Sequence, residues 1–494
     1  MRSRWLGVPL IGMTSPASQH TRSHDLLIRG GQVLLGRRGT AAVDVAIQDG
    51  RIAALGQDLG DAREVIDAGG RPVLPGAVDA HCHLGIYRSL AEDAESETLS
   101  SLRGGVTTVI SYFRTGSHYL NRTGAYEQVF PEVLETIAGR AHTDYAFHLA
   151  PMTADQVGEI PTLVDAYGIN SFKYYMFYKG LDLSGVGDAS QERMSENYDL
   201  GHLYAIMEAL ADVAARPDPR RRSLSIHAEQ PELIRLFMER VRTAGELSGL
   251  EAYSAARPTL TERVAIAEAG TLATATGCPI NLLHLSSAEA LDAGIELRRA
   301  RPQLDVRLET TAHHLALSYE SYDDQRGKVN PPIRSEADRE ALWEGLLAGH
   351  IDWVVSDHAC CSESLKEGDM WAAQPGFGGS AILYPYLLTE GARRGLPLWR
   401  VAELLATNPA RAFGLTPRKG QIAVGADADL VIVDVDTVRT VTPELLLSAQ
   451  EYTPFAGMKL TGWPATTLLR GEVVLRDGAP VTGPTGRYVN ATGA

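Results

Sequence analysis

The stretch Val-Leu-Pro-Gly-Ala-Val-Asp-Ala-His-Cys-His-Leu, residues 73–84, decides the fold of this chain. An apolar run passes through Pro75 and Gly76 into a second short run, which is typical of a buried strand. Because side chains alternate along a strand, His81 and His83 at its end point to the same side. Two neutral imidazoles placed in this way can bind one metal ion, although two ordinary histidines would give the same pattern.

The central part of the chain, residues 75–415, alternates short apolar strands with amphipathic stretches. Strands are expected at 107–110, 146–150, 171–173, 223–227, 280–284 and 353–357. Helices are expected, among others, at 203–216, 262–276 and 336–348. Repeated strand-then-helix units imply a parallel sheet, and about eight of them predict a (β/α)₈ TIM barrel of the α/β class.

Both ends of the chain are rich in short strands and turns. Residues 25–74 and 416–482 contain runs such as 43–47 and 428–433, with an Asp-Gly hairpin signal at 49–50. The simplest packing joins the two segments into one small β-sandwich domain. The remaining residues, 1–24 and 483–494, are predicted to be an N-terminal extension and a C-terminal tail.

The charge and composition exclude several classes of protein. The chain has 46 basic and 61 acidic residues, a formal net charge of −15, which argues against nucleic acid and anionic membranes as partners. Four cysteines in 494 residues do not make a disulfide framework, so reduced thiols and a cytoplasmic location are predicted. No window reaches the ~20 apolar residues of a transmembrane helix.

Potential ligands follow the predicted strands at one end of the barrel. Barrel enzymes place their chemistry at the carboxyl ends of their strands. Beyond His81 and His83, the strands end at Lys173, His227, His284 and Asp357. Any one of these could be an ordinary residue, and a histidine such as His227 is often a satisfied core side chain. Their joint placement predicts a metal site.

Lys173 stands in an apolar setting, between Ser-Phe and a run of aromatic residues. Burial lowers the pKa of an unpaired lysine, and a neutral amine can react with carbon dioxide to give a carbamate that bridges two metals. The alternative is a lysine that reaches solvent from the strand end. Histidines, a carbamate and a carboxylate suit Zn²⁺, with Mn²⁺, Fe²⁺ or Co²⁺ possible. Two such metal ions can supply a bridging hydroxide. Asp357 can take the proton of the attacking water and deliver it to a leaving nitrogen.

Several longer motifs extend this pattern. They are Pro75-Gly76-x-x-Asp79-x-His81-x-His83, Gly104-Gly105-Val106-Thr107-Thr108, Ser171-Phe172-Lys173, His227-Ala228-Glu229, His284-Leu285-Ser286, Ser356-Asp357-His358-Ala359 and Asn408-Pro409-Ala410. Together they resemble the amidohydrolase superfamily, in its cyclic-amidase branch of dihydropyrimidinases (hydantoinases), allantoinases and dihydroorotases. The likeness covers residues from Leu26 to about Asp477.

The resemblance implies a role for each of the matching residues. One metal would be held by His81, His83, Lys173 and Asp357, and the other by Lys173, His227 and His284. Asp357 would be the catalytic acid and base. Tyr178 would hydrogen-bond the substrate carbonyl, although it could also be a simple aromatic wall, and Asn330 would bind the amide edge of the ring.

The resemblance leaves the substrate open. Dihydroorotases carry an arginine directly after His-x-His-Leu, whereas this chain has Gly85 there. The predicted function is hydrolytic opening of a cyclic amide or ureide of the hydantoin or dihydropyrimidine type by a metal-bridged hydroxide. The alternatives are an allantoinase or dihydroorotase-like enzyme and a hydrolase of an acyclic amide or carbamate. The aromatic segment 174–178, with Tyr87 and Phe377, suggests a pocket for an apolar substituent.

Two further expectations come from the same resemblance. The branch includes non-catalytic scaffold proteins that lack metal ligands, and the filled ligand positions of this chain favour an enzyme instead. Members of the family commonly form homo-oligomers, so a tetramer or dimer acting on a small molecule is expected.

Overall fold

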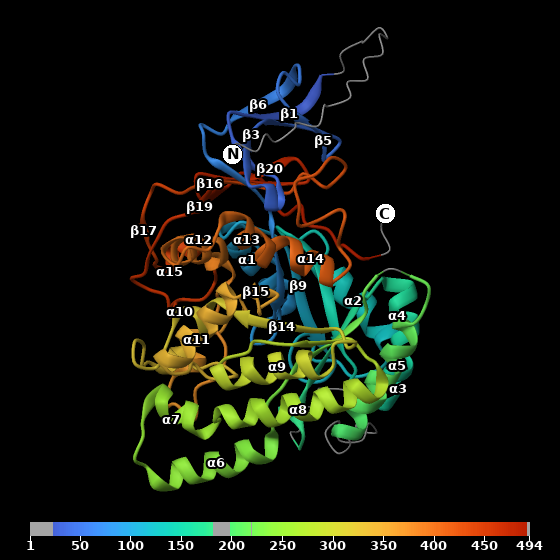
Figure 1. The fold of residues 1–494 in the computed structure, drawn as a ribbon, viewed down its shortest axis with the longest axis vertical. Coiled ribbons are helices and arrows are strands. Elements are labelled where there is room, and N and C mark those ends of the chain that lie inside the picture. The colour runs from blue at the N-terminus through green and yellow to red at the C-terminus, as the bar shows by residue number, and fades with distance from the viewer. Residues whose placement is uncertain (1–22, 181–197, 219, 492–494) are drawn as a thin grey trace, which may run out of the picture.

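The computed structural model describes residues 23–180, 198–218 and 220–491 (Figure 1). The predicted N-terminal extension, residues 1–24, lies almost wholly outside the described residues. Its last residue, His24, already belongs to the first strand, β1 (His24–Arg29). Among the described residues, no helix is both long enough and apolar enough to cross a membrane.

Eight parallel strands form the predicted barrel, which confirms the fold class. They follow one another around the sheet in chain order, from β8 to β15. A parallel bridge between Cys82 and His358 brings the two edges together. The strands are β8 (Ala77–Cys82), β9 (Val106–Arg114), β10 (Asp144–Ala150), β11 (Ser171–Tyr175), β12 (Ser223–His227), β13 (Ile280–Leu282), β14 (Val306–Thr311) and β15 (Trp353–Val355).

Helices cover the outside of the barrel, as Figure 1 shows for α8 and α9 beside β14. The main ones are α1 (Leu90–Arg103), α2 (Tyr126–Ile137), α4 (Ile160–Tyr167), α5 (Leu200–Ala214), α6 (Pro231–Ala244), α7 (Gly249–Ala256), α8 (Thr259–Thr276), α9 (Ala288–Ala300), α11 (Glu336–Leu347) and α12 (Leu383–Arg393). Shorter ones are α3 (Ala154–Gly158), α10 (Ala312–Ala316), α13 (Leu398–Ala402), α14 (Asn408–Ala412) and α15 (Pro443–Leu446).

Helix starts follow local capping chemistry. Ser89 and Glu92 form a capping box at the start of α1, where each side chain bonds the other residue's backbone. The helix expected from residue 203 begins earlier, at Leu200, because the Asp199 side chain accepts hydrogen bonds from the first backbone N–H groups.

Two of the expected strands end before the predicted metal ligands His284 and Asp357. The stretches 280–284 and 353–357 are extended only as far as Leu282 and Val355. His284 and Asp357 instead have positive φ angles of 35° and 51°. Such conformations are costly for residues other than glycine and are found at functional sites.

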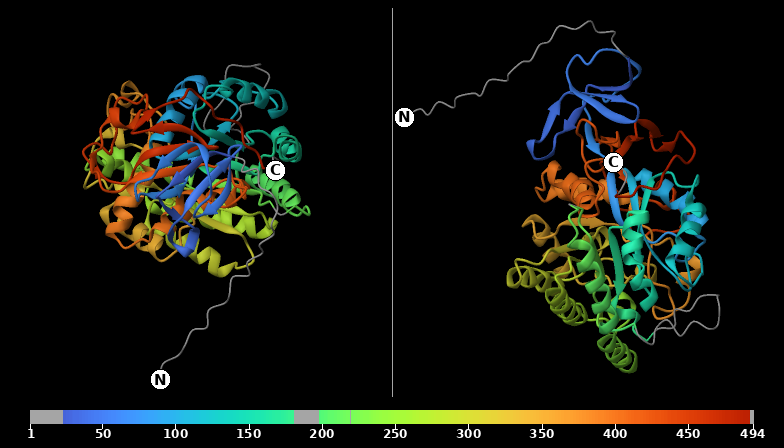
Figure 2. Two further views of the ribbon diagram at one scale, coloured as in Figure 1. Left: turned by 90° about the horizontal axis from the view of Figure 1, so that it is seen from above. Right: turned by 90° about the vertical axis from the view of Figure 1, so that its right-hand side faces the viewer.

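A separate sheet domain sits at one end of the barrel, at the top of Figure 1 and of the right-hand view in Figure 2. Its seven-stranded sheet runs β21-β20-β19-β16-β7-β2-β3 and combines strands from both chain ends. Its four-stranded sheet runs β5-β4-β1-β6 and contains strands from the N-terminal segment alone. Leu26, Val45, Val73, Leu430 and Leu468 belong to the apolar core that both sheets share.

The strands of this domain are short. Besides β1, they are β2 (Gln32–Leu34), β3 (Thr40–Ala42), β4 (Asp44–Gln48), β5 (Arg51–Gly56), β6 (Ala62–Asp67), β7 (Pro72–Pro75), β16 (Leu430–Asp434), β19 (Trp463–Leu469), β20 (Glu472–Arg476) and β21 (Ala479–Pro480), while β17 (Arg439–Thr440) pairs with β18 (Lys459–Leu460). The predicted C-terminal tail packs onto the barrel, where the Val489 N–H donates to the Tyr145 carbonyl at 2.8 Å. The domain boundaries themselves stay predictions.

Candidate metal centre and its pocket

The six predicted ligands converge at the carboxyl ends of the barrel strands. Asp357 Oδ1 lies 3.0 Å from His81 Nε2 and 3.2 Å from His83 Nε2. Ligand atoms of His81, His284 and Asp357 all lie within 4.8 Å of one another. The rings of His227 and His284 have their centres 4.3 Å apart.

Lys173 lies beside this group, and its side chain is wholly buried. Its Nζ is 4.1 Å from the ring centre of Tyr112, and that ring meets His81 edge-on with 4.4 Å between centres. The snorkelling alternative, in which the lysine reaches solvent, is therefore wrong.

The donor set fits a pair of bound cations. His81 Nε2, Lys173 Nζ and both ring nitrogens of His284 are buried without a hydrogen-bond partner among the described residues. Buried polar atoms normally have partners, so orphaned nitrogens that converge on a carboxylate mark space for a ligand. Nitrogen and carboxylate donors are what Zn²⁺ and its neighbours bind.

The electrostatics favour the protonation states that metal binding needs at most of the predicted ligands. His81 differs, since burial lowers its pKa but Asp357 and Glu309 raise it by more. Burial lowers the pKa of His83 and of His227 to about 4, so both imidazoles are neutral near pH 7. Burial alone would raise the pKa of Asp357, but the nearby His81 and His83 lower it well below its usual range. Burial also lowers the pKa of Lys173 to about 7, against the opposing effect of Asp357 and Glu309.

Two buried glutamates orient the histidines, and sequence reasoning assigned a role to neither. His81 Nδ1 donates to Glu309 Oε1 at 2.7 Å, which leaves Nε2 to face Asp357. His227 Nε2 donates to Glu229 Oε2 at 2.7 Å, which leaves Nδ1 for a metal. Carboxylates behind ligating histidines are a common feature of metal sites. Glu309 lies within β14, a strand that no sequence motif identified.

A cavity of about 280 Å³ opens onto this cluster. It is lined by His83, His227, His284 and Asp357, and by both predicted substrate-binding residues, Tyr178 and Asn330. The Tyr253 hydroxyl donates to Asn330 Oδ1 at 2.6 Å and so orients the amide group. Of the aromatic residues expected in the pocket, Tyr87, Tyr175 and Phe177 line it as well.

The expectation of an apolar pocket is only partly met. Phe377 is a core residue that packs edge-on against His313 and Phe455 and does not line the cavity. Arg114, which no sequence motif drew attention to, does line it.

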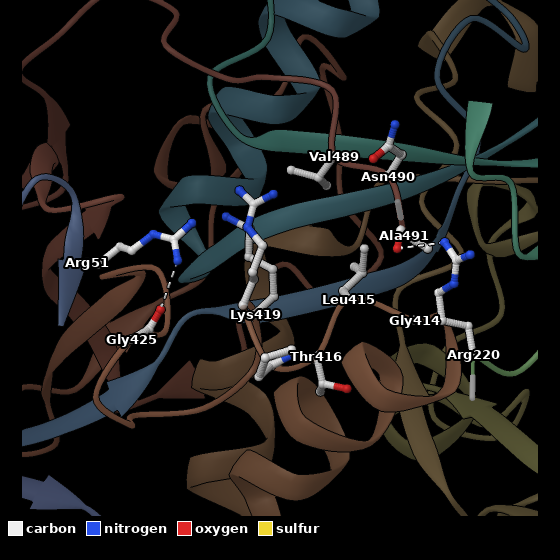
Figure 3. A pocket seen from close by; sticks show the side chains of 12 residues that line it. Arg51, Arg220, Gly414, Leu415, Thr416, Lys419, Gly425, Val489, Asn490 and Ala491 are labelled. Carbon is white, nitrogen blue, oxygen red and sulfur yellow. Dashed lines mark hydrogen bonds between the residues drawn. The ribbon is translucent and has the colours of Figure 1, made fainter. Parts of the chain in front are cut away.

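A second cavity, of about 410 Å³, is lined by residues that include Arg51, Arg220 and Lys419 (Figure 3). It adjoins the amino end of β10, because its lining residue Lys419 bonds Asp144, the first residue of that strand. It contains none of the predicted ligands. Its cations are engaged: Arg220 donates to the Ala491 carbonyl and Lys419 to buried aspartates. The predicted ligands and substrate-binding residues that line a cavity therefore line the smaller one.

Comparison with known proteins identifies a matching family and several similar proteins. The model of the amidohydrolase family matches residues 201–474. The allantoinase of Rubrobacter xylanophilus is 34% identical over 472 residues, which cover 94% of this chain and 97% of that protein. The allantoinase of Bacillus licheniformis is 33% identical, with 94% and 99% of the two chains covered.

Solved structures of similar proteins have the same fold. A D-hydantoinase superposes with a TM-score of 0.83 at 29% identity, over 94% of this chain and 98% of that chain. The L-hydantoinase (dihydropyrimidinase) from Arthrobacter aurescens also reaches 0.83 at 29% identity, over 94% and 100% of the two chains.

Proposed function

The chain belongs to the amidohydrolase family, in its cyclic-amidase branch, and from this we propose that it opens the hydantoin ring of a small-molecule substrate. It is a metal-dependent hydrolase that acts on the C–N bonds of cyclic amides. The family and enzyme predictions are thereby confirmed, and the scaffold alternative is wrong. The ring on which the enzyme acts is the part that we propose.

The hydantoin ring is what the two groups of relatives have in common. The similar sequences are named allantoinases, and most of the similar structures are named hydantoinases, some of them with the second name dihydropyrimidinase. Allantoin is itself a hydantoin that carries a ureido group on C5. The five-membered ureide ring is the substrate feature that allantoinases and hydantoinases share, and the relatives leave the substituent on C5 undecided.

The metal centre is part of the proposal. Members of this family generally use two metal ions and a carboxylated lysine. We assign the first metal here to His81, His83, Lys173 and Asp357, and the second to Lys173, His227 and His284. Zn²⁺ is the metal we propose, with Mn²⁺, Co²⁺ or Fe²⁺ able to replace it, and carbon dioxide as the source of a Lys173 carbamate. Such a centre makes hydroxide available near neutral pH and polarises a carbonyl.

Three side chains of this chain would carry out the rest of the reaction. Asp357 is ionised at neutral pH, so it can accept the proton of the attacking water and deliver it to the leaving ring nitrogen. The Tyr178 hydroxyl would donate to the carbonyl oxygen as negative charge develops there, a contact typically worth ~3 kcal/mol. Asn330, oriented by Tyr253, would bind the amide edge of the ring.

Oligomer and location stay as proposals. A homotetramer or homodimer is inferred from the family resemblance alone. A cytoplasmic location is supported by the cysteines, since all four are buried and free.

The observation that carries the proposal is the orphaned nitrogens beside Asp357 in a cavity lined by Tyr178 and Asn330. The test is ring opening by Zn²⁺- or Mn²⁺-loaded protein of hydantoin, allantoin, dihydrouracil, dihydroorotate and an acyclic N-acylurea. The kcat/KM for a hydantoin ring should exceed that for the six-membered rings by about tenfold or more. Asp357→Asn should abolish turnover, whereas Asp165→Asn, at a surface ion pair with Arg216, should not.

Each opposing result has a definite meaning. Faster turnover of the six-membered rings would show that the ring size is wrong. Equal turnover of the acyclic compound would show that the enzyme does not require a ring. No turnover of any compound, with two metals bound, would remove the proposed function.

A further inference from the structure

Arg114 is the last residue of β9 and lines the cavity above the metal-ligand candidates. Its side chain is almost completely buried, with 3% of its surface exposed. The guanidinium carbon lies 5.4 Å from the ring centre of Tyr178 and 5.8 Å from that of Tyr119. Tyr119 in turn contacts His83 through its hydroxyl at 3.0 Å. Arg114 thus contacts the proposed oxyanion donor, Tyr178, directly and is linked to the predicted ligand His83 through Tyr119.

The guanidinium does not use all of its donors inside the protein. Nη1 donates to the carbonyls of Thr115 at 3.2 Å and Ser117 at 2.9 Å, which fixes its orientation. Nε is buried and has no hydrogen-bond partner among the described residues. Nε and Nη2 share the edge that matches the two oxygens of a carboxylate. This edge therefore holds an unused donor, Nε, that could bind an anion beside Tyr178, whose side chain also hydrogen-bonds the guanidinium.

The positive charge of Arg114 is also uncompensated. In the described parts of the chain no carboxylate forms an ion pair with it, and aromatic hydroxyls are its main electrostatic neighbours. Burial lowers the pKa of Arg114, but Tyr178 and Tyr119 raise it by more, so the group stays charged. Among the residues that line the cavity, the carboxylate is Asp357, which faces His81 and His83 instead.

A buried charge without a partner is costly, and removing water from it is repaid only by an ion or strong hydrogen bonds. Arg257, also buried, shows the ordinary solution in this protein: Glu229 accepts hydrogen bonds from it and forms an ion pair with it. Arg114 has no such protein partner in a pocket built to receive a small molecule. The missing partner is expected to come with the substrate.

We propose that Arg114 is a specificity-determining residue that binds a carboxylate, or a similar anionic group, on the substituent of the substrate ring. This rests on the proposed function and narrows it, because the substrate would be an anionic cyclic ureide rather than an apolar one. The anion would dock beside Tyr178 while the ring amide lies over the metal centre. An anion-binding Arg114 would also give a polar role to a pocket that is otherwise lined by several aromatic residues.

The test compares two hydantoins that differ in charge but hardly in shape. These are 5-(2-carboxyethyl)hydantoin and its amide, 5-(2-carbamoylethyl)hydantoin. Charge-assisted bidentate hydrogen bonds predict that kcat/KM of the metal-loaded wild-type protein is about 10- to 100-fold higher for the carboxylate. In Arg114→Gln this ratio should fall to within about threefold of unity, and Arg114→Lys, which keeps the charge but not the fork, should lie between.

Arg122→Gln serves as the matched control, since Arg122 follows the same strand but pairs with Glu132 at the surface. It should keep the wild-type ratio. Metal content and circular dichroism establish that the Arg114 variants are folded. A wild-type ratio near one would overturn the proposal. So would an Arg114→Gln variant that loses both activities by the same factor, because Arg114 would then act by positioning Tyr178.

A failure of the proposed function is distinguishable from a failure of this inference. If neither hydantoin is opened, calorimetric titration of both compounds into wild-type protein and Arg114→Gln decides the matter. If the carboxylate binds more tightly than the amide, and this difference depends on Arg114, the anion site is retained and the proposed reaction is wrong. Equal binding of the two compounds would remove it.

Discussion

Two buried clusters at opposite ends of the barrel are built from the same kinds of side chain. At the carboxyl ends of the strands, Lys173 lies among histidines near Asp357, and its Nζ has no hydrogen-bond partner among the described residues. At the amino ends, Lys419 donates to Asp144 at 2.5 Å and to Asp429 at 2.7 Å, and Asp427 lies 3.0 Å away. Both lysines are removed from solvent, yet only one has its charge matched.

The difference between the clusters decides the chemistry of each amine. Burial alone would lower the pKa of Lys419, but the three aspartates raise it well above its usual value. Burial lowers the pKa of Lys173 to about 7, because its carboxylate neighbours do not make up for the loss of water. Lys419 is a permanent cation that holds the barrel to the sheet domain, whereas Lys173 is an amine that can react.

The comparison also separates two groups that could hold a metal by spacing alone. Asp144, Asp427 and Asp429 place carboxylate oxygens as close together as His81, His284 and Asp357 do. The aspartates are already neutralised by Lys419 and Arg470. Proximity of ligand atoms is therefore a weaker criterion than the presence of atoms without partners.

The largest expected effect is the loss of Lys173. A Lys173→Ala variant should lose bound metal and at least about 1,000-fold in kcat/KM, since the proposed bridge between the two cations is gone. The metals are counted by elemental analysis. Added propionate, which supplies a carboxylate to the space left by the side chain, should restore part of both. A variant that kept full metal content and activity would show that no carbamate is needed.

Lys419→Met should have the opposite profile. Removing the ammonium leaves buried carboxylates without a counter-charge, which typically costs about 3–5 kcal/mol. Unfolding in denaturant should therefore begin at a lower concentration than for wild type, while the metal content per folded molecule stays the same. Unchanged stability would mean that the aspartates take up protons or water easily, and the contrast between the two clusters would be lost.

A smaller effect is expected from Glu309, which holds His81. Glu309→Gln should weaken metal affinity by about 10- to 100-fold, because the amide is a poorer acceptor for His81 Nδ1 and a poorer orienting group. Competition with a chelator measures this. Glu132→Gln, at the surface, is the control. Equal affinity in both variants would show that strand geometry alone orients His81.

The sequence was enough to predict the barrel and the convergence of the predicted ligands. The reason is physical: the carboxyl ends of parallel strands meet at one end of a barrel, so His81, Lys173 and His227 must approach one another. The same rule does not describe how the chain leaves a strand. His284 and Asp357 were expected within extended segments, and both have positive φ angles that only the surrounding structure can enforce.

Residues that act through contacts distant in sequence were not predictable from one chain. Glu309 is recognisable only when β14 is placed beside β13, and Arg114 only when β9 ends at the cavity. Neither residue stands in a local pattern that distinguishes it from an ordinary acidic or basic side chain. Phe377 was predicted to line the pocket, but it lies in the core. An aromatic residue near a motif suits either place, so the sequence alone does not decide between them.

The smallest effect is a pH dependence that only Lys173 should show. Its neutral amine is the form that reacts with carbon dioxide, and with a pKa of about 7 the neutral fraction falls about tenfold per pH unit below 7. Reactivation of metal-free protein at constant dissolved carbon dioxide should therefore rise with pH up to about 7 and level off above 8. Incorporation of ¹³C-labelled carbon dioxide, followed by NMR, should show the same profile and be absent from Lys173→Ala. A rate that keeps rising towards pH 10 would indicate an ordinary lysine pKa, and the two buried lysines would then differ less than their surroundings suggest.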